Sequence, residues 1–202
     1  MGEHIISTGV DPKIPPVDLM AANFRESVEQ IKSPESRASE IESAIKHHIT
    51  VNLEEDPEYY KSLSLRLRDI IEKTNGKWEQ QLDLLQDLVG SIESTRKQDA
   101  DDKGLDETEM AFYRILVAEV ARHSGDDVVG EDVDDEIKAT TQTLVEMFDE
   151  ATQIVDFFKK GEQIKRMKKA IKRAILDCSF GDKAIVNVVQ ERFMDLAKTK
   201  FR

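Results

Sequence analysis

Apolar residues recur at intervals of three and four along most of the chain, the spacing that places them on one face of an α-helix. Residues 57–74 show the pattern clearly, with Tyr60, Leu63, Leu67 and Ile70 in succession. Alternation of apolar and polar residues, which would indicate β-strands, is scarce. The pattern therefore predicts an all-α fold, an irregular bundle of six to eight helices. Comparable stripes lie within residues 34–49, 78–92, 107–120, 137–155, 162–178 and 183–196.

Several helix boundaries are marked by capping residues. Ser33-Pro34 and Asp56-Pro57 each combine a capping side chain with a proline suited to the first helical position. Asp106 and Glu109 have the spacing of a capping box, in which each side chain accepts a hydrogen bond from the other's backbone amide. We therefore expect helices to begin at residues 34, 57 and 107.

Two neighbouring stripes predict an antiparallel helical hairpin. The helix that ends near residue 74 and the helix that begins at Trp78 are separated only by Asn75-Gly76, which suits a helix C-terminus. A connection this short brings two helices side by side with opposite directions.

The remaining segments are expected to be irregular. Pro12, Pro15 and Pro16 predict an extended linker over residues 1–22, followed by a helical domain over residues 23–202. Polar residues 99–104 and acidic residues 123–135 are expected to form loops. Gly161 is expected to separate the helix of residues 137–155 from the helix that follows it.

Charge is distributed very unevenly along the chain. The whole sequence of 202 residues has a net charge of -12, but residues 159–173 contain eight Lys or Arg and a single Glu. From residue 159 onward there are 13 Lys and Arg against 5 Asp and Glu, and the preceding residues hold 16 against 36. Such a division is typical of a surface that contacts an anion, either a nucleic acid or an acidic protein.

A helical projection arranges these basic residues on one side of the predicted helix. An apolar stripe that includes Ile164, Met167 and Ile171 lies beside a continuous cationic band. Three interpretations remain open: a solvated face neutralised by the protein's own acidic residues, a contact with nucleic-acid phosphates, or a docking face for another subunit. Membrane-surface binding is less favoured because the apolar stripe is narrow. The band consists of Lys165, Arg166, Lys168, Lys169, Lys172 and Arg173.

The chain shows no convincing catalytic or metal-binding motif, so we expect no catalytic residue, no metal ligand and no cofactor. Gly125 and Gly130 have the spacing of a phosphate-binding loop, but Glu131-Asp132 stands where Lys and Ser or Thr are required. Glu136-Ile137-Lys138 has half of a nuclease motif, but it lies on a predicted helix rather than a strand. His47 and His48 are adjacent and therefore diverge on a helix, which does not suit shared metal ligation.

Cysteine content and hydropathy bear on the location of the protein. The single Cys178 excludes a disulfide framework and suits a reducing cytosol, and its position on an apolar helical stripe predicts a buried, unreactive thiol. No stretch approaches the ~20 apolar residues of a membrane span. We therefore expect a cytoplasmic protein without a membrane-spanning segment.

Three segments in this order resemble one known family. They are SRASEIESAIKHHITVNLEEDPEYYKSLSLRLRDIIEK (36–73), GLDETEMAFYRIL (104–116) and QIVDFFKKGEQIKRMKKAIKRAIL (153–176). Together they resemble the C-terminal helical region of the R (restriction, motor) subunit of type I restriction-modification enzymes. GVDPKIPPVDL (9–19) resembles the segment that links the motor's second helicase lobe to that region.

The resemblance implies a role in assembly. In that family the R subunit is an ATP-dependent site-specific deoxyribonuclease and translocase that uses ATP and magnesium in other domains, and none of that machinery occurs in this sequence. The C-terminal region is associated with docking the motor onto the modification (M) subunit and with contact to double-stranded DNA. We therefore expect a non-catalytic assembly domain, with residues 1–22 as the linker from an upstream motor domain.

Two alternatives are direct binding of DNA backbones by the basic helix and a free-standing helical adaptor with an acidic protein partner. The M subunit or double-stranded DNA would contact the six basic residues of the band.

Overall fold

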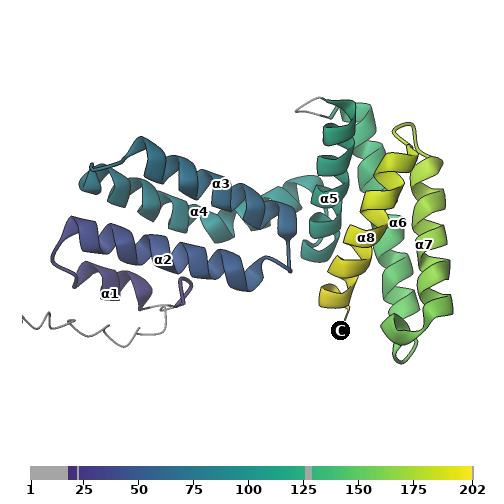
Figure 1. Ribbon diagram of the computed structural model, residues 1–202, viewed down its shortest axis with the longest axis horizontal. Coiled ribbons are helices and arrows are strands. Elements are labelled where there is room, and N and C mark those ends of the chain that lie inside the picture. The colour runs from purple at the N-terminus through teal and green to yellow at the C-terminus, as the bar shows by residue number, and fades with distance from the viewer. Residues whose placement is uncertain (1–17, 22, 126–128, 202) are drawn as a thin grey trace, which may run out of the picture.

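The computed structural model describes residues 18–21, 23–125 and 129–201. These residues form helices joined by short turns, and the described part of the chain contains no β-strand, so the all-α prediction is confirmed (Figure 1). The elements are α1 (Phe24–Glu29), α2 (Pro34–Asn52), α3 (Pro57–Lys73), α4 (Trp78–Lys103), α5 (Glu107–Ser124), α6 (Glu131–Thr152), the short 3-10 helix η1 (Phe157–Lys159), α7 (Gly161–Leu176) and α8 (Lys183–Lys200).

The predicted helix starts are confirmed. Ser33 Oγ accepts a hydrogen bond from the amide of Ser36 at 3.2 Å, and Asp56 Oδ1 accepts one from the amide of Tyr59 at 3.3 Å. The capping box before α5 is complete, because the amide of Glu109 donates to Asp106 Oδ1 at 2.7 Å and the amide of Asp106 donates to Glu109 Oε2 at 2.8 Å. These bonds satisfy amides that have no partner within the helix.

Helices α1 to α4 form an N-terminal lobe. The predicted hairpin of α3 and α4 is confirmed, with Gly76 at φ +76° in the turn between them, and α4 also packs along α2. Sequence analysis missed α1, which lies against α2 and buries Phe24 and Val28. Of the predicted linker, residues 1–17 and 22 lie outside the described residues, and Leu19 is buried in the core of this lobe.

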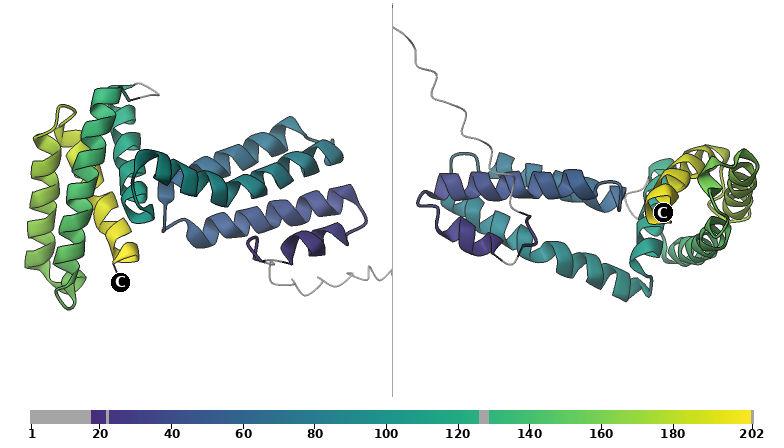
Figure 2. Two further views of the ribbon diagram at one scale, coloured as in Figure 1. Left: turned by 180° about the vertical axis from the view of Figure 1, so that it is seen from behind. Right: turned by 90° about the horizontal axis from the view of Figure 1, so that it is seen from below.

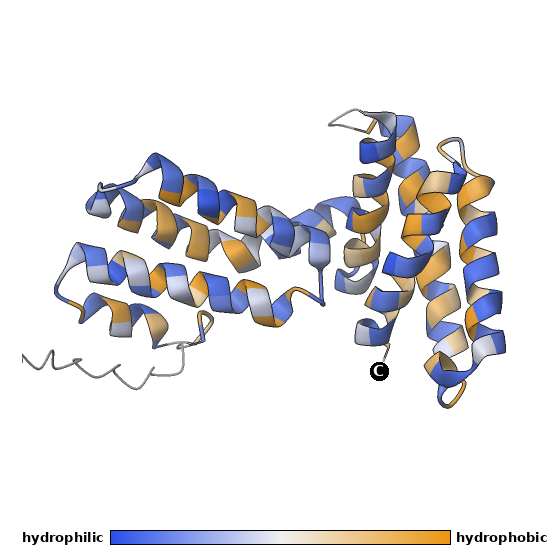
Figure 3. Ribbon diagram, viewed as in Figure 1, coloured by the Kyte–Doolittle hydropathy of each residue, from blue (hydrophilic) through white to orange (hydrophobic). Residues whose placement is uncertain are grey.

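Helices α5 to α8, with η1, form a C-terminal lobe that has its own core (Figure 2). Phe112 of α5 lies at its centre, with ring centroids 5.6 Å from Phe148 of α6 and 4.9 Å from Phe193 of α8. The apolar faces of the helices turn inward in each lobe separately (Figure 3). Among the described residues, the buried apolar side chains form two clusters, one in each lobe, and the chain passes from one lobe to the other where α4 leads into α5.

The expected loop at residues 99–104 is wrong for most of its length. Helix α4 continues to Lys103 and ends at Gly104, which adopts φ +62° as its left-handed C-cap. Ala100 explains the extension, because it is buried in the core of the C-terminal lobe although its neighbours in sequence are polar. A single buried residue gives no periodic signal in the sequence.

The expected acidic loop at residues 123–135 is much shorter in the structure. Helix α5 extends to Ser124 and α6 begins at Glu131. Residues 126–128, between the two glycines that have the spacing of a phosphate-binding loop, lie outside the described residues. Glu131, Asp132 and Asp134 occupy the first turn of α6. Carboxylates are favourable there because the N-terminal end of a helix carries partial positive charge.

The helix expected over residues 137–155 stops earlier. Helix α6 ends at Thr152, Val155 lies in the following turn with 80% of its surface exposed, and Asp156 adopts φ +58°. Gly161 is the first residue of α7 rather than part of the connection. Val155 has the sequence spacing of a buried helical residue, but it is neither helical nor buried.

Candidate functional site: the basic face of helix α7

Helix α7 lies on the side of the C-terminal lobe that is turned away from the N-terminal lobe (Figures 1 and 2). Met167, Ile171 and Ile175 are buried on its inner side, where α7 packs against α6 and α8. This confirms the apolar stripe that the sequence predicts. The stripe fixes the rotation of α7, so the side of the helix opposite the stripe faces solvent.

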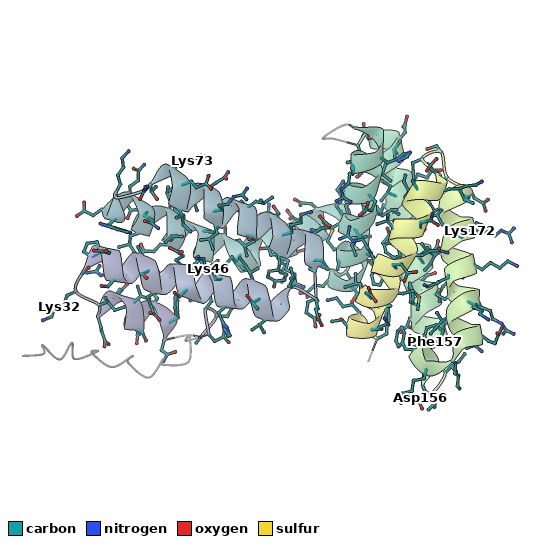
Figure 4. All side chains as sticks on the ribbon, viewed as in Figure 1. Lys32, Lys46, Lys73, Asp156, Phe157 and Lys172 are labelled. Atoms are coloured by element: carbon teal, nitrogen blue, oxygen red, sulfur yellow. The ribbon has the colours of Figure 1, made fainter. Side chains whose placement is uncertain are left out.

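Five of the six predicted band residues are exposed. Figure 4 shows Lys172 pointing away from the body of the lobe, into solvent. Among the described residues, no carboxylate forms an ion pair with Arg166, Lys169 or Lys172. We use the name basic band from here on for the exposed set Lys165, Arg166, Lys169, Lys172 and Arg173.

Two band residues do have carboxylate neighbours on their own helix or just beyond it. Lys165 Nζ lies 3.2 Å from Glu162 Oε1, and Arg173 Nε lies 3.7 Å from Asp177 Oδ2. All four side chains are at least 72% exposed. Exposed pairs one helical turn apart contribute only ~0.3–0.5 kcal/mol and are screened by salt. Both cations therefore remain available to an external anion.

Lys168 differs from the rest of the predicted set. Its side chain is 32% exposed, and Nζ donates a hydrogen bond to Glu191 Oε1 of α8 at 2.5 Å. Gln190 Nε2 donates to the backbone oxygen of Lys168, so two polar contacts join α7 to α8 at this position. Lys168 thus contributes to helix packing.

A hollow beside the basic band could not be predicted from the sequence. It lies between α6 and α7 and has a volume of about 310 Å³. Apolar Met147, Ala151, Phe157, Met167 and Ala170 line it together with polar Glu150, Gln163 and Arg166. Met147 exposes 36% of its surface. The hollow depends on how α6 and α7 pack, which a one-dimensional pattern does not contain.

The comparison with protein families decides what the chain is related to. A model of the C-terminal region of type I restriction enzyme HindI endonuclease subunit-like proteins matches residues 6–193. The chain belongs to this family. The match covers all of α1 to α7 and most of α8, including the basic band. No curated protein and no solved structure matches the chain.

A second charged cluster lies at the junction of the two lobes. Arg114 of α5 contacts Asp56 at 2.5 Å and Asp99 at 3.1 Å, and Arg192 of α8 contacts Glu119 at 2.6 Å and also pairs with Glu58. A groove of about 700 Å³ opens over Arg192, with Leu53 and Leu65 on its walls. We call the six charged residues the junction network.

The electrostatics of the junction network fit a structural role. Burial acts to raise the pKa of Glu119, but hydrogen bonds from Arg122 and Arg192 outweigh it and the pKa is lowered. A general acid or base needs a pKa near the working pH, and this shift is in the opposite direction. Burial raises the pKa of Asp56, and the charge of Arg114 opposes that rise. The carboxylates of the network serve as partners for arginines.

The other sequence candidates are occupied by structural contacts. Glu136 of the nuclease-like triplet lies on α6 and accepts hydrogen bonds from the amide and hydroxyl of Ser179, which fixes the turn before α8. His48 of α2 packs edge-on against Tyr60, with ring centroids 5.6 Å apart. Within residues 18–21, 23–125 and 129–201, no group of three or more His, Cys, Asp or Glu could hold a metal ion.

Cys178 lies just beyond the end of α7 and is half-buried, rather than fully buried on the helix as expected. Its thiol donates to the backbone oxygen of Ala174 at 3.1 Å and lies 3.2 Å from Thr140 Oγ1. Burial raises its pKa, which disfavours the reactive thiolate. Across the described helices, none is both long and apolar enough to cross a membrane.

Proposed function

We propose that this chain is a non-catalytic assembly domain of a type I restriction endonuclease subunit, and that it docks the nuclease and translocase onto the modification complex. Membership of the family supports the assignment to that subunit. The exposed basic band, most of which lacks a carboxylate partner among the described residues, supports α7 as the docking element.

One observation favours a protein partner over DNA. The hollow between α6 and α7 has mainly apolar walls, and its lining also includes one cation, Arg166, and one carboxylate, Glu150. Protein interfaces combine an apolar centre, often rich in Met and Arg, with a polar rim. A DNA backbone would engage the cations but would leave the hollow empty. The partner surface that fits is acidic and presents an apolar side chain to the hollow.

Charge reversal tests the basic band. We expect Lys165→Glu/Lys169→Glu/Arg173→Glu to retain helicity, because all three side chains face solvent. Binding to the purified modification subunit should weaken by about 30-fold or more, since truncating one interfacial charge pair costs about 2 kcal/mol or more. Isothermal titration calorimetry measures the affinity, and circular dichroism checks the fold.

A matched reversal on the other lobe serves as the control. Arg68→Glu/Lys73→Glu/Lys77→Glu introduces the same change of charge at exposed positions, and Arg68 and Lys73 also have carboxylate neighbours on their own helix. We expect this variant to bind almost normally. An equal loss of affinity for the modification subunit in both triple variants would show that net charge, rather than the basic band, governs binding. That result would contradict the proposal.

Direct binding to DNA is the alternative, and the exposed cations of the basic band are the observation that favours it. Phosphate contacts release counterions, so affinity for a short duplex should fall steeply between about 50 mM and about 200 mM salt. Met147→Lys separates the two functions. An added cation beside Arg166 should maintain or strengthen DNA binding but weaken docking of an apolar side chain into the hollow. Unchanged docking by both Met147→Lys and the α7 triple variant would refute the assembly role.

A further inference from the structure

Among the helices that the structure describes, only α4 contributes residues to both cores. Leu82, Leu85, Leu88 and Ile92 belong to the core of the N-terminal lobe, and Ala100 belongs to the core of the C-terminal lobe. Residues 94–99, which lie between them, are polar and none of them belongs to either core. A helix that is polar on all sides commonly bridges two bodies through solvent. This part of α4 therefore acts as a strut between the lobes (Figure 2).

Ion pairs cross the junction beside the strut, where α3 also packs against α5. Arg114 and Arg192 of the C-terminal lobe pair with Asp56 and Glu58 at the start of α3, and Lys200 Nζ lies 2.9 Å from Glu55. Ion pairs weaken gradually with distance, whereas close-packed apolar cores lose contact energy after a small displacement. The lobes are thus held by contacts that tolerate a change of angle better than either core would.

The N-terminal side of the strut contains a residue that weakens the helix. Gly90 lies inside α4, and a Cβ atom added there would meet no other atom within 4 Å. Packing therefore does not require glycine at this position, although glycine in a helix interior costs about 0.5–1 kcal/mol relative to alanine. Ser94 Oγ donates to the backbone oxygen of Gly90 at 3.3 Å. Such back-bonding by serine often bends a helix.

We propose that residues 90–99 of α4 form a hinge, and that ion pairs across the junction form a latch that sets the angle between the lobes. The latch consists of the Arg114–Asp56, Arg192–Glu58 and Lys200–Glu55 pairs. Helix α7 is on the far side of the C-terminal lobe from α4, so rotation about the hinge displaces the basic band more than the helices near the junction (Figure 1). The latch thereby controls where the basic band is presented, whichever partner binds it.

A distance measurement between the lobes tests the hinge. Spin labels at Lys73→Cys on α3 and Asp177→Cys after α7 occupy exposed positions, with Cys178→Ser removing the native thiol. Double electron–electron resonance then gives the distribution of distances between them. We expect this distribution to shift or broaden as salt rises from about 0.01 M to about 1 M, because the Debye length falls from about 30 Å to about 3 Å. Far-UV circular dichroism should remain constant.

Two substitutions and one control separate the hinge from the latch. Arg192→Gln opens part of the latch and should give a broader distribution at low salt, whereas Gly90→Ala should narrow it by stiffening α4. Gly161→Ala also replaces a helical glycine whose added Cβ meets no atom within 4 Å, but on α7, and should leave the width unchanged. A distribution that stays the same in high salt and in Arg192→Gln would overturn the proposal. If Arg192→Gln fails to fold, Lys200→Gln, which removes the cation that pairs with Glu55, takes its place and is read together with the salt series.

Discussion

The two lobes differ in how they bury apolar surface. The N-terminal lobe packs mainly Leu, Ile and Ala between long helices, with Tyr59 and Tyr60 near the junction, whereas the C-terminal lobe centres on Phe112, Phe148 and Phe193. Each lobe encloses its own cluster, and ion pairs such as Arg114–Asp56 and Arg192–Glu58 cross the junction between them. The stability of each lobe should therefore depend on its own core, while the junction network determines how the lobes are arranged.

The largest expected effects come from opening a cavity in either core. Phe193→Ala should destabilise the C-terminal lobe by about 3–5 kcal/mol, and Leu85→Ala should destabilise the N-terminal lobe by about 2–5 kcal/mol. Both side chains are fully buried. The single Trp78 lies on α4 in the N-terminal lobe, so its fluorescence during urea unfolding reports on that lobe. Leu85→Ala should shift the fluorescence transition, and Phe193→Ala should shift only the transition seen by circular dichroism. An equal shift of fluorescence in both variants would contradict independent lobes.

Breaking the junction network at its most buried pair should have a comparable effect on stability. Arg114→Met leaves the fully buried carboxylate of Asp56 without its closest cation, which costs about 3–5 kcal/mol. Because burial already raises the pKa of Asp56, loss of Arg114 raises it further. A carboxyl group whose pKa is raised by folding stabilises the folded state at pH values below its ordinary pKa of 3.8. That stabilisation is lost as the pH rises through the pKa of the carboxyl group in the folded state. The loss of stability caused by Arg114→Met should thus be smaller at about pH 4 than at about pH 7.

A double variant provides the control for this pair. Asp56→Asn retains an oxygen that can accept from the amide of Tyr59 and cap α3, but it removes the carboxylate charge. Asp56→Asn/Arg114→Met should therefore recover much of the stability lost in Arg114→Met and should lose the pH dependence. Denaturant melts at several pH values measure both effects. A deficit that is constant with pH would show that lost packing, rather than the unpaired charge, is responsible.

The smallest expected effect concerns a polar defect in the C-terminal core. Thr141 Oγ1 is buried and finds no hydrogen-bond partner among the described residues. Thr141→Val should stabilise this lobe by about 1 kcal/mol or more, because an unsatisfied buried polar group costs roughly 1–3 kcal/mol. The adjacent Thr140 is the matched control, since its hydroxyl lies 3.2 Å from Cys178 Sγ and Thr140→Val loses that contact. In thermal melts, Thr141→Val should have a higher melting temperature than the unmodified chain. The melting temperature of Thr140→Val should be equal to or lower than that of the unmodified chain.

Most helix starts could be predicted because their signals are local. The capping residues Ser33, Asp56 and Asp106 each accept a hydrogen bond from the amide three positions ahead, in the helix that they begin, so sequence spacing contains the relevant geometry. The predictions that were wrong concern residues whose burial depends on contacts with another helix or turn. Ala100 continues α4 because the other lobe buries it, and Val155 falls outside α6 although its spacing suits the helix.

The candidate site shows the same division. Lys165, Lys169 and Arg173 could be placed on one exposed face because the apolar stripe of α7 fixes the rotation of the helix. The separate role of Lys168 could not be predicted, since Glu191 lies on a different helix. The hollow next to Arg166 likewise arises from the packing of α6 against α7.

The amino-acid sequence alone determined the helical class, the capped helix starts, the concentration of positive charge on one helix and the resemblance to the restriction-subunit family. These properties depend on interactions within a few residues or on the order of residues itself. The tertiary structure decided that the helices divide into two cores, that α4 spans them and that arginines of one lobe pair with carboxylates of the other. Arg192 and Glu58 are far apart in the chain, so their contact exists only after the lobes have been brought together.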